Sequence, residues 1–185
     1  MSEWFETLDG LWDCAWKLLA QGVADRNHPA RQPTFATVSP DGWPEARTVV
    51  LRALDQTKRS LDIQTDLQSD KIKSLEETSK AAVHFWSPEQ RLQIRVQASV
   101  RVLSGPEVEA IWQTVPDVAR QAYGISPAPG TPIANALDYV KAPDRANFAV
   151  LKCAAQTMDL LHLGDDYRRA RFTRARDWVG EWLAP

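Results

Sequence analysis

The segment from Leu92 to Leu103 alternates apolar and polar side chains without a break, and this pattern constrains the fold more than any other. The apolar positions are Leu92, Ile94, Val96, Ala98, Val100 and Val102, and Gln93, Arg95, Gln97, Ser99 and Arg101 lie between them. Successive side chains of a β-strand point to opposite faces, so the pattern predicts a strand with one buried and one polar face.

Other β-rich runs precede this strand. Thr34–Ser39 and Ala46–Leu54 flank an Asp-Gly turn and predict a hairpin. Strands are also predicted at Ser60–Thr65 and Ala81–Trp86. Between these two, Ile72–Thr78 suits a short amphipathic helix with Ser69 or Asp70 as its N-cap.

Helices are expected on both sides of this block. Residues 3–21 carry apolar side chains at helical spacing and predict an amphipathic helix, with Ser2 as N-cap and Gly22 past its end. We expect this helix to pack against the barrel or against a partner subunit. Residues 21–33 form a connector. Residues 106–123 predict a helical segment that begins at Pro106 and is interrupted by Pro116.

The chain returns to strands near its end. The expected strands are Asn147–Cys153, Met158–Leu163, Tyr167–Thr173 and Trp178–Leu183, and Gly164 begins a hairpin turn. The prediction is therefore a single domain over residues 1–185, with a barrel core at 34–104 and C-terminal strands at 147–183. Its class is α+β, a mainly antiparallel split β-barrel with peripheral helices.

Composition excludes several partners. A formal net charge of −2 and an isoelectric point near 5.9 give no basic field for nucleic acid. No run approaches the roughly 20 apolar residues of a membrane span, and the N-terminus lacks the basic start of a signal peptide, so we expect a cytoplasmic protein without membrane contact. Cys14 and Cys153 lie far apart and the histidines are scattered, so no metal site is predicted.

Five polar side chains could converge on an anion. A phosphate monoester is bound by Arg, Lys and hydroxyl donors. The candidates are Arg47, Arg52, Thr65, Ser69 and Lys71. Arg47 and Arg52 leave opposite faces of a regular strand, so they share a ligand only at strand ends or across a bulge. Two arginines that merely solvate strand ends would give the same pattern.

Several short motifs occur in a fixed order. They are Arg47–Arg52, similar to an Arg-x-Val-Leu-Leu-Lys strand; Ile63–Asp66, similar to Phe-Tyr-Thr-Asn; Ser69–Lys71, similar to Ser-Arg-Lys; Arg91–Val96, similar to Glu-Arg-Gln-Val; and the ending Arg168–Phe172 with Leu183–Pro185. Together they resemble the pyridoxamine 5'-phosphate oxidase-like group of FMN-binding split barrels. The resemblance covers residues 34–104 well and the last thirty residues loosely.

This resemblance implies FMN as cofactor and a homodimer with FMN at the subunit interface. It assigns Arg47, Ser69 and Lys71 to the phosphate, and Val49 and Val50 to the flavin. Further flavin contacts fall on Arg52, Gln64, Thr65, Arg171 and Gln93, the last from the second subunit. Substrate contacts fall on Arg52, Arg120 and Arg169. A register slip of two would exchange Arg169 and Arg171, and Arg120 could equally be an exposed helix residue.

The chain also departs from the family pattern. Asp70 replaces a phosphate-binding Arg and would repel a dianion unless it points away. Leu161 replaces a flavin-stacking Trp. The helical positions that bind substrate phosphate carry Ile111, Val115 and Ala119, so pyridoxamine phosphate is not the expected substrate.

The expected function is an FMN-dependent oxidoreductase acting on an unidentified small molecule. No catalytic residue is assigned, because the flavin accepts the hydride and the protein supplies placement and electrostatics. The alternatives are a flavin reductase, a carrier of reduced flavin, a flavin-dependent sensor, or a non-catalytic FMN- or haem-binding protein. His84 is the barrel's candidate axial haem ligand.

Overall fold

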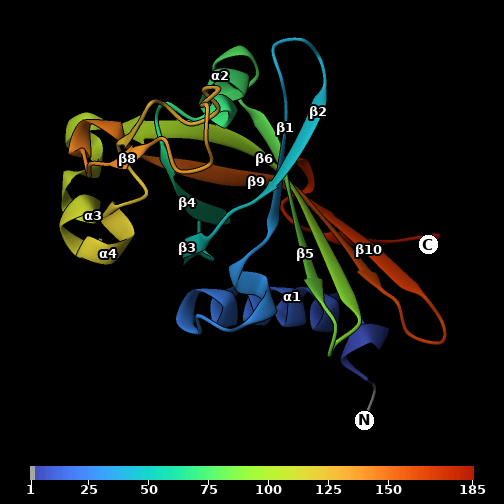
Figure 1. Cartoon of the computed structure of the whole chain (residues 1–185). Coiled ribbons are helices and arrows are strands. Elements are labelled where there is room, and N and C mark those ends of the chain that lie inside the picture. The colour runs from blue at the N-terminus through green and yellow to red at the C-terminus, as the bar shows by residue number, and fades with distance from the viewer. Residues whose placement is uncertain (1–2) are drawn as a thin grey trace.

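The structure is a computed structural model that describes residues 3–185. One open sheet of nine strands carries the fold, and all its pairings are antiparallel (Figure 1). Its order is β11-β10-β9-β6-β5-β1-β2, and β4 pairs with both β9 and β3. The strands are β1 (Thr34–Val38), β2 (Pro44–Thr48), β3 (Leu51–Asp55), β4 (Ser60–Asp66), β5 (Lys80–Ser87), β6 (Leu92–Ser104), β9 (Phe148–His162), β10 (Arg168–Thr173) and β11 (Gly180–Leu183). The α+β prediction is confirmed.

Strand β9 occupies the centre of the sheet and corrects the sequence prediction. Residues 147–153 and 158–163 were expected as two strands, but one strand of 15 residues runs through both. It pairs with β4 along its first half, with β10 along its second, and with β6 along nearly all of it. Thr157 faces Gln97 and Ala155 faces Ala98, so Gln156 is an extra residue in a bulge. Such a bulge interrupts the alternation of faces, which explains the mistaken break.

The predicted strand at residues 46–54 is broken in the middle. β2 ends at Thr48 and β3 begins at Leu51, with Val49 and Val50 between them. β2 pairs with β1 whereas β3 pairs with β4, so the chain moves at this point from one region of the sheet to another. The backbone N–H of Val49 donates to the carbonyl of Pro33 at 3.0 Å. This contact supports the backbone where the regular pairing stops.

Helix α1 (Leu8–Ala24) packs on the sheet, as one of the two expectations proposed. It buries an apolar face made of Leu11, Ala15, Trp16, Leu18 and Leu19. Its bounds were predicted wrongly: a short 3-10 turn (Trp4–Glu6) precedes it, and the side chain of Thr7 caps it by accepting from the N–H of Gly10. Ser2 lies outside the described residues. Gly22 is buried inside the helix rather than past its end. A Cβ at this position would lie 2.7 Å from the backbone of Ala30, so the site requires glycine.

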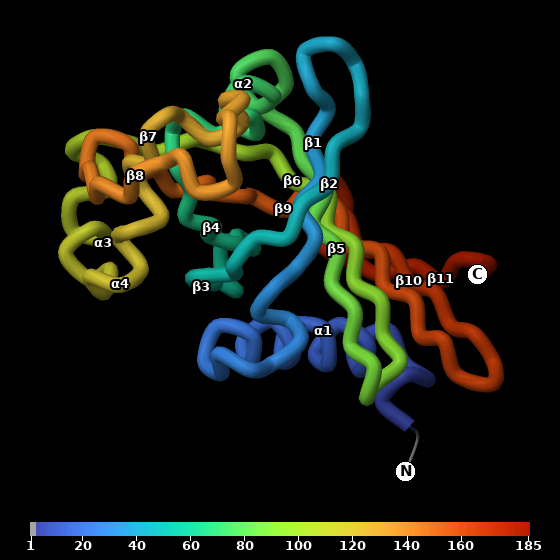
Figure 2. The backbone as a smooth tube through the Cα atoms, viewed as in Figure 1, coloured from blue at the N-terminus to red at the C-terminus, as the bar shows by residue number. Residues whose placement is uncertain are grey.

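The remaining helices lie along the sheet's margins. Helix α2 (Asp70–Glu77) has Ser69 at the N-cap position, as predicted. Helices α3 (Glu109–Thr114) and α4 (Asp117–Arg120) lie at the end of the molecule away from β10 and β11 (Figure 2). They cover a second small core around Trp112, Tyr123 and Phe148. Short 3-10 turns occur at Pro29–Arg31, Gly105–Val108, Arg145–Asn147 and Arg174–Arg176, and β7 (Ile125–Ser126) pairs with β8 (Val140–Lys141). Within residues 3–185, the structure contains no helix with the length and apolarity of a membrane span.

Candidate functional site

A cavity of about 330 Å³ lies where the β2–β3 junction, the end of β4 and the start of α2 meet. Ala122, Tyr123 and Pro129, from the segment that follows α4, complete its wall. Eight side chains predicted to contact the cofactor line this cavity together: Arg47, Val49, Val50, Arg52, Gln64, Thr65, Ser69 and Lys71. The structure therefore brings into one place residues that three separate sequence motifs supplied.

The break between β2 and β3 is what allows Arg47 and Arg52 to share this cavity. On a continuous strand, side chains five positions apart point to opposite faces. Here Val49 and Val50 interrupt the strand, and a further register shift follows between Leu51 and Ala53. The two arginines therefore line the same cavity from different strands. This is one of the two arrangements under which the sequence allowed them to meet.

Lys71 forms the centre of a group of polar side chains at one end of the cavity. Its Nζ donates to Oγ1 of Thr65 at 3.0 Å, and that oxygen lies 3.2 Å from Oγ of Ser69. Burial lowers the pKa of the Lys71 ammonium, and the charge of Arg47 lowers it further. Its Nζ lies beyond 4 Å from every carboxylate oxygen of the described residues. The ammonium therefore lacks an ion-pair partner where it is partly desolvated.

Arg47 is held in place by its own strand and by β1. Its Nη1 donates to Oγ1 of Thr37 at 2.7 Å, and its Nη2 pairs with Oε2 of Glu45 at 2.8 Å. These contacts fix the guanidinium in one orientation at the cavity wall. Because Glu45 already offsets part of its charge, Arg47 has less uncompensated charge to offer an anion than Lys71 has.

Asp66 and Asp70, the acidic residues next to Thr65 and Lys71 in the sequence, both have other partners. Asp70 does not line the cavity, and its carboxylate pairs with Lys73 at 3.1 Å. Asp66 does line it, but Oδ1 accepts from the N–H of Gln68 at 2.7 Å and Oδ2 accepts from the N–H of Gly124 at 2.8 Å. Asp70 thus lies outside the cavity and is paired with Lys73, which agrees with the condition that the sequence set for an anion to bind.

Tyr123 is a lining residue that the sequence reasoning missed. Its hydroxyl donates to Oε1 of Gln64 at 3.4 Å, and burial raises its pKa. Arg52 lies close enough to oppose that rise, and the buried Nε of Arg52 has no hydrogen-bond partner. Tyr123 follows α4 in a segment without regular periodicity, so no sequence signal connected it with β4.

The other predicted contacts lie outside this cavity. Gln93, on β6, has its amide oxygen 3.3 Å from Nε2 of His84. Arg169 pairs with Asp159 at 2.9 Å, and Arg171 pairs with Glu181 at 2.9 Å. Arg120 is committed within its own helices: it pairs with Asp117 at 3.0 Å, donates to the carbonyl of Trp112 at 3.1 Å, and lies over the Trp112 ring.

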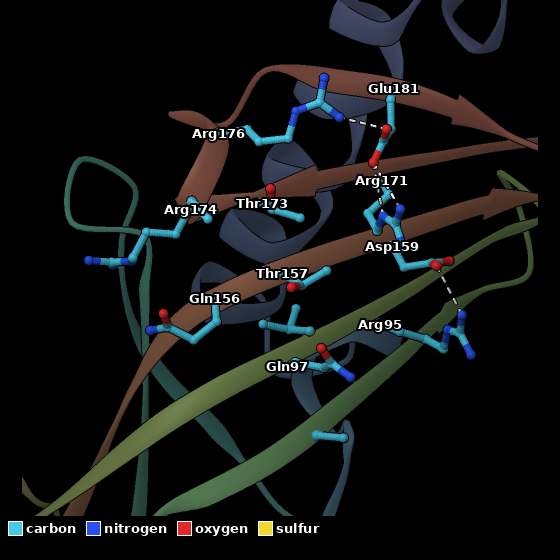
Figure 3. A pocket seen from close by; sticks show the side chains of 13 residues that line it. Arg95, Gln97, Gln156, Thr157, Asp159, Arg171, Thr173, Arg174, Arg176 and Glu181 are labelled. Carbon is cyan, nitrogen blue, oxygen red and sulfur yellow. Dashed lines mark hydrogen bonds and ion pairs between the residues drawn. The ribbon is translucent and has the colours of Figure 1, made fainter.

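A larger hollow of about 1020 Å³ lies along the sheet beside β6, β9 and β10 (Figure 3). Three of its four arginines pair with its two carboxylates: Arg95 with Asp159 at 3.0 Å, and both Arg171 and Arg176 with Glu181. The fourth, Arg174, donates to the backbone carbonyls of Ala155 and Lys58. Of the ten predicted cofactor contacts, Arg171 is the one found here.

Comparison with known proteins identifies the family that this chain matches. Residues 13–104 match the family described as pyridoxamine 5'-phosphate oxidase, FMN-binding domain. They belong to this family. The match includes β1–β6 and α2, and therefore every cavity residue except those contributed by the segment after α4. The resemblance stated from the sequence is confirmed, and the cofactor of the family is FMN.

Named relatives agree with this assignment. The pyridoxine/pyridoxamine 5'-phosphate oxidase of Azorhizobium caulinodans is 35% identical over 99 residues, which are 52% of this chain and 46% of that protein. The Nostoc punctiforme enzyme of the same name is 33% identical over 110 residues, covering 60% of this chain and 50% of that one. The chain thus aligns with about half the length of these curated relatives.

Solved structures extend the likeness over nearly the whole chain. A pyridoxamine 5'-phosphate oxidase-related, FMN-binding protein from Nostoc punctiforme superposes with a TM-score of 0.77 at 26% identity, covering 94% of this chain and 96% of that one. PhzG from Burkholderia lata, solved with tetrahydrophenazine-1-carboxylic acid, gives a TM-score of 0.73 at 20% identity over 94% and 92% of the chains. The second likeness concerns the fold alone.

The residues present fit the family's cofactor. A phosphate monoester carries about −1.5 to −2 charge near neutral pH and accepts hydrogen bonds strongly. The cavity offers it an ammonium without an ion-pair partner, a fixed guanidinium and two hydroxyls: Lys71, Arg47, Thr65 and Ser69. Val49 and Val50 provide apolar surface beside them. This donor set has the composition that an FMN phosphate with an adjoining ring requires.

Proposed function

We propose that this chain binds FMN in the Lys71 cavity and acts as an FMN-dependent oxidoreductase on a small molecule. The observation that carries the proposal is the convergence of eight predicted cofactor contacts on one cavity, with an unpaired Lys71 among them. Lys71, Arg47 and Ser69 would bind the phosphate. Val49 and Val50 would contact the ring, and Gln64, Thr65 and Arg52 would supply polar contacts along it.

The flavin, when bound, supplies the hydride-accepting chemistry. The chain's part is to hold and orient it and to limit the access of water. Arg47 is positioned for this role by Thr37 and Glu45, and Lys71 by Thr65. Tyr123 and Pro129 close one side of the cavity. No described side chain has to donate or remove a proton at a fixed position in this scheme.

The proposal includes a homodimer with FMN at the subunit interface. Gln93 lies outside the cavity that holds eight of the predicted contacts, which agrees with its delivery by a second subunit. The cavity's volume of about 330 Å³ is also near the lower end of the range of about 300–1,000 Å³ typical of small-molecule sites. A second chain would supply the missing wall.

Haem binding has less support. His84 was the candidate axial ligand, but it does not line the Lys71 cavity and its Nε2 lies beside the amide oxygen of Gln93.

A flavin carrier or flavin reductase would use the same cavity as an oxidase. These activities differ in what approaches the ring rather than in how the phosphate is held.

The direct test is a titration of the purified apoprotein with FMN, followed by flavin fluorescence and by molecular mass at equilibrium. Saturation at one FMN per chain in a dimer is the expected result. A screen of small molecules for flavin reduction then separates oxidase from carrier. A protein that binds no FMN, or binds it as a monomer, contradicts the proposal.

A further inference from the structure

Tyr123 contributes a phenol to the wall of the Lys71 cavity. Its hydroxyl donates to Oε1 of Gln64 at 3.4 Å, although 59 positions separate the two residues in the sequence. Both side chains line the cavity. The family match ends at residue 104, so Tyr123 lies beyond the matched region. It therefore borders the cofactor cavity without belonging to the predicted cofactor contacts.

The phenol is held firmly by its surroundings. Tyr123 is 4% exposed, and its ring meets the rings of Phe148 and Trp112 edge-on, with centroids 4.9 Å and 6.1 Å away. Its backbone N–H donates to the carbonyl of Arg120 at 3.0 Å, and its own carbonyl accepts from the N–H of Asp144 at 2.9 Å. Ring and backbone are thus both fixed, so the hydroxyl is kept at one place in the wall.

The neighbouring Arg52 decides which way the hydrogen bonds of Tyr123 run. Burial raises the pKa of the phenol, while the charge of Arg52 and a hydrogen bond from its side chain lower that pKa. A guanidinium can only donate, so the phenol oxygen is the acceptor for Arg52. The O–H of Tyr123 is then left to donate to the amide oxygen of Gln64, as the structure shows.

This arrangement fixes the orientation of the Gln64 amide. A glutamine amide can present either its oxygen or its NH₂ group to a ligand, unless a neighbour decides between them. Here the oxygen is engaged by Tyr123. Within residues 3–185, no acceptor takes a hydrogen bond from Nε2 of Gln64. Its two N–H donors therefore remain available at the cavity wall.

Gln64 lies apart from the group that would bind the FMN phosphate. That group is Lys71, Thr65 and Ser69, linked by hydrogen bonds of 3.0 Å and 3.2 Å. Gln64 precedes Thr65 on β4, but its side chain contacts Tyr123 instead. Phosphate and ring are at opposite ends of FMN. A cofactor held at its phosphate by Lys71 would therefore bring its ring toward Gln64.

We propose that Tyr123 is a positioning residue that keeps the N–H donors of Gln64 toward the flavin ring and thereby raises the reduction potential of bound FMN. The inference rests on the proposed function, because it requires FMN in the Lys71 cavity. The reduced ring carries more negative charge at its pyrimidine edge than the oxidised ring, so fixed donors there stabilise the reduced form more. Tyr123 acts through Gln64 and needs no contact with the cofactor.

The test is the reduction potential of bound FMN, measured by equilibration with a redox dye of known potential. Tyr123→Phe removes the hydroxyl and keeps the ring that packs on Phe148 and Trp112. Its preference for reduced over oxidised FMN should fall about tenfold, which is a drop of about 30 mV for a two-electron couple. Tyr139→Phe is the matched control, because it loses a hydroxyl outside this cavity. Its potential should equal that of the wild type.

A double-mutant cycle separates action through Gln64 from direct action on the ring. Gln64→Met removes the amide at similar length and should lower the potential by a similar amount. Adding Tyr123→Phe to Gln64→Met should then lower it no further. A full additional drop, or an unchanged potential in Tyr123→Phe with FMN bound, overturns this inference and leaves the proposed function intact. A wild-type protein that binds no FMN refutes the proposed function, and this inference with it.

Discussion

Replacing Lys71 by Met should separate the role of this residue in binding from its role in folding. A hydrogen bond to a charged partner contributes about 1.5–3 kcal/mol, so the variant should bind FMN about 10-fold to 150-fold more weakly. The same change removes a partly buried ammonium that has no carboxylate partner. Without FMN the variant should therefore be at least as stable as the wild type, because burying an uncompensated charge is costly.

Lys73→Met is the control for this experiment. Lys73 lies on the same helix, loses the same charge and pairs with Asp70 at the surface. Exposed pairs contribute about 0–1 kcal/mol, so its FMN dissociation constant should change by less than about fivefold. FMN affinity is measured by fluorescence titration, and stability by urea unfolding without cofactor. Equal FMN binding by Lys71→Met and wild type would show that the phosphate is held elsewhere.

Three further predictions concern pH and packing. Burial lowers the pKa of Lys71, and a bound phosphate would raise it again. The FMN dissociation constant should therefore rise with pH between the pKa of Lys71 in the free protein and its pKa in the complex, by up to about tenfold per pH unit. Titrations from pH 7 to 10.5 should show the rise, and Lys71→Arg should flatten it. Burial lowers the pKa of His162 below its usual value near 6.5. The stability linked to His162 is therefore present above that value and is lost as pH falls toward the folded-state pKa. Urea unfolding should show His162→Phe gaining stability relative to wild type between pH 7 and pH 5, and a constant difference would refute the assignment. Gly22→Val should lower the free energy of unfolding by about 1–3 kcal/mol, because its Cβ would meet the backbone of Ala30 at 2.7 Å. Thermal unfolding should show a melting temperature several degrees lower. The control Ala20→Val should lack this drop, because Ala20 is exposed and the change alters only helix propensity.

Most of the strands and the start of helix α2 at Ser69 could be predicted because their signals are local. Leu92–Leu103 alternates regularly, and β6 has the expected bounds within one residue. Ser69 is the N-cap of helix α2, and the few residues around it were enough to predict that a helix begins there after β4. Short-range periodicity and capping are encoded where they act.

Two features that the sequence did not predict, the bulge at Gln156 and the ion pairs of Arg169 and Arg171, involve partners distant in sequence. The bulge at Gln156 depends on pairing with Gln97 and Ala98, so nothing near Gln156 announces it. The ion pairs of Arg169 and Arg171 depend on strand neighbours that only the sheet register brings close. The start of α1 was misplaced for a local reason: Trp4 and Leu8 fit a single helical period, although a 3-10 turn precedes the cap at Thr7.

The central position of β9 has a consequence for how the chain is made. During synthesis β4 and β6 emerge from the ribosome long before residues 148–162, which pair with both of them. Until then, each of these strands has an unpaired backbone edge, and an exposed edge can pair with another chain. Folding that waits for contacts between distant segments is slow. The nascent protein therefore passes through an aggregation-prone interval that ends when β9 joins the sheet.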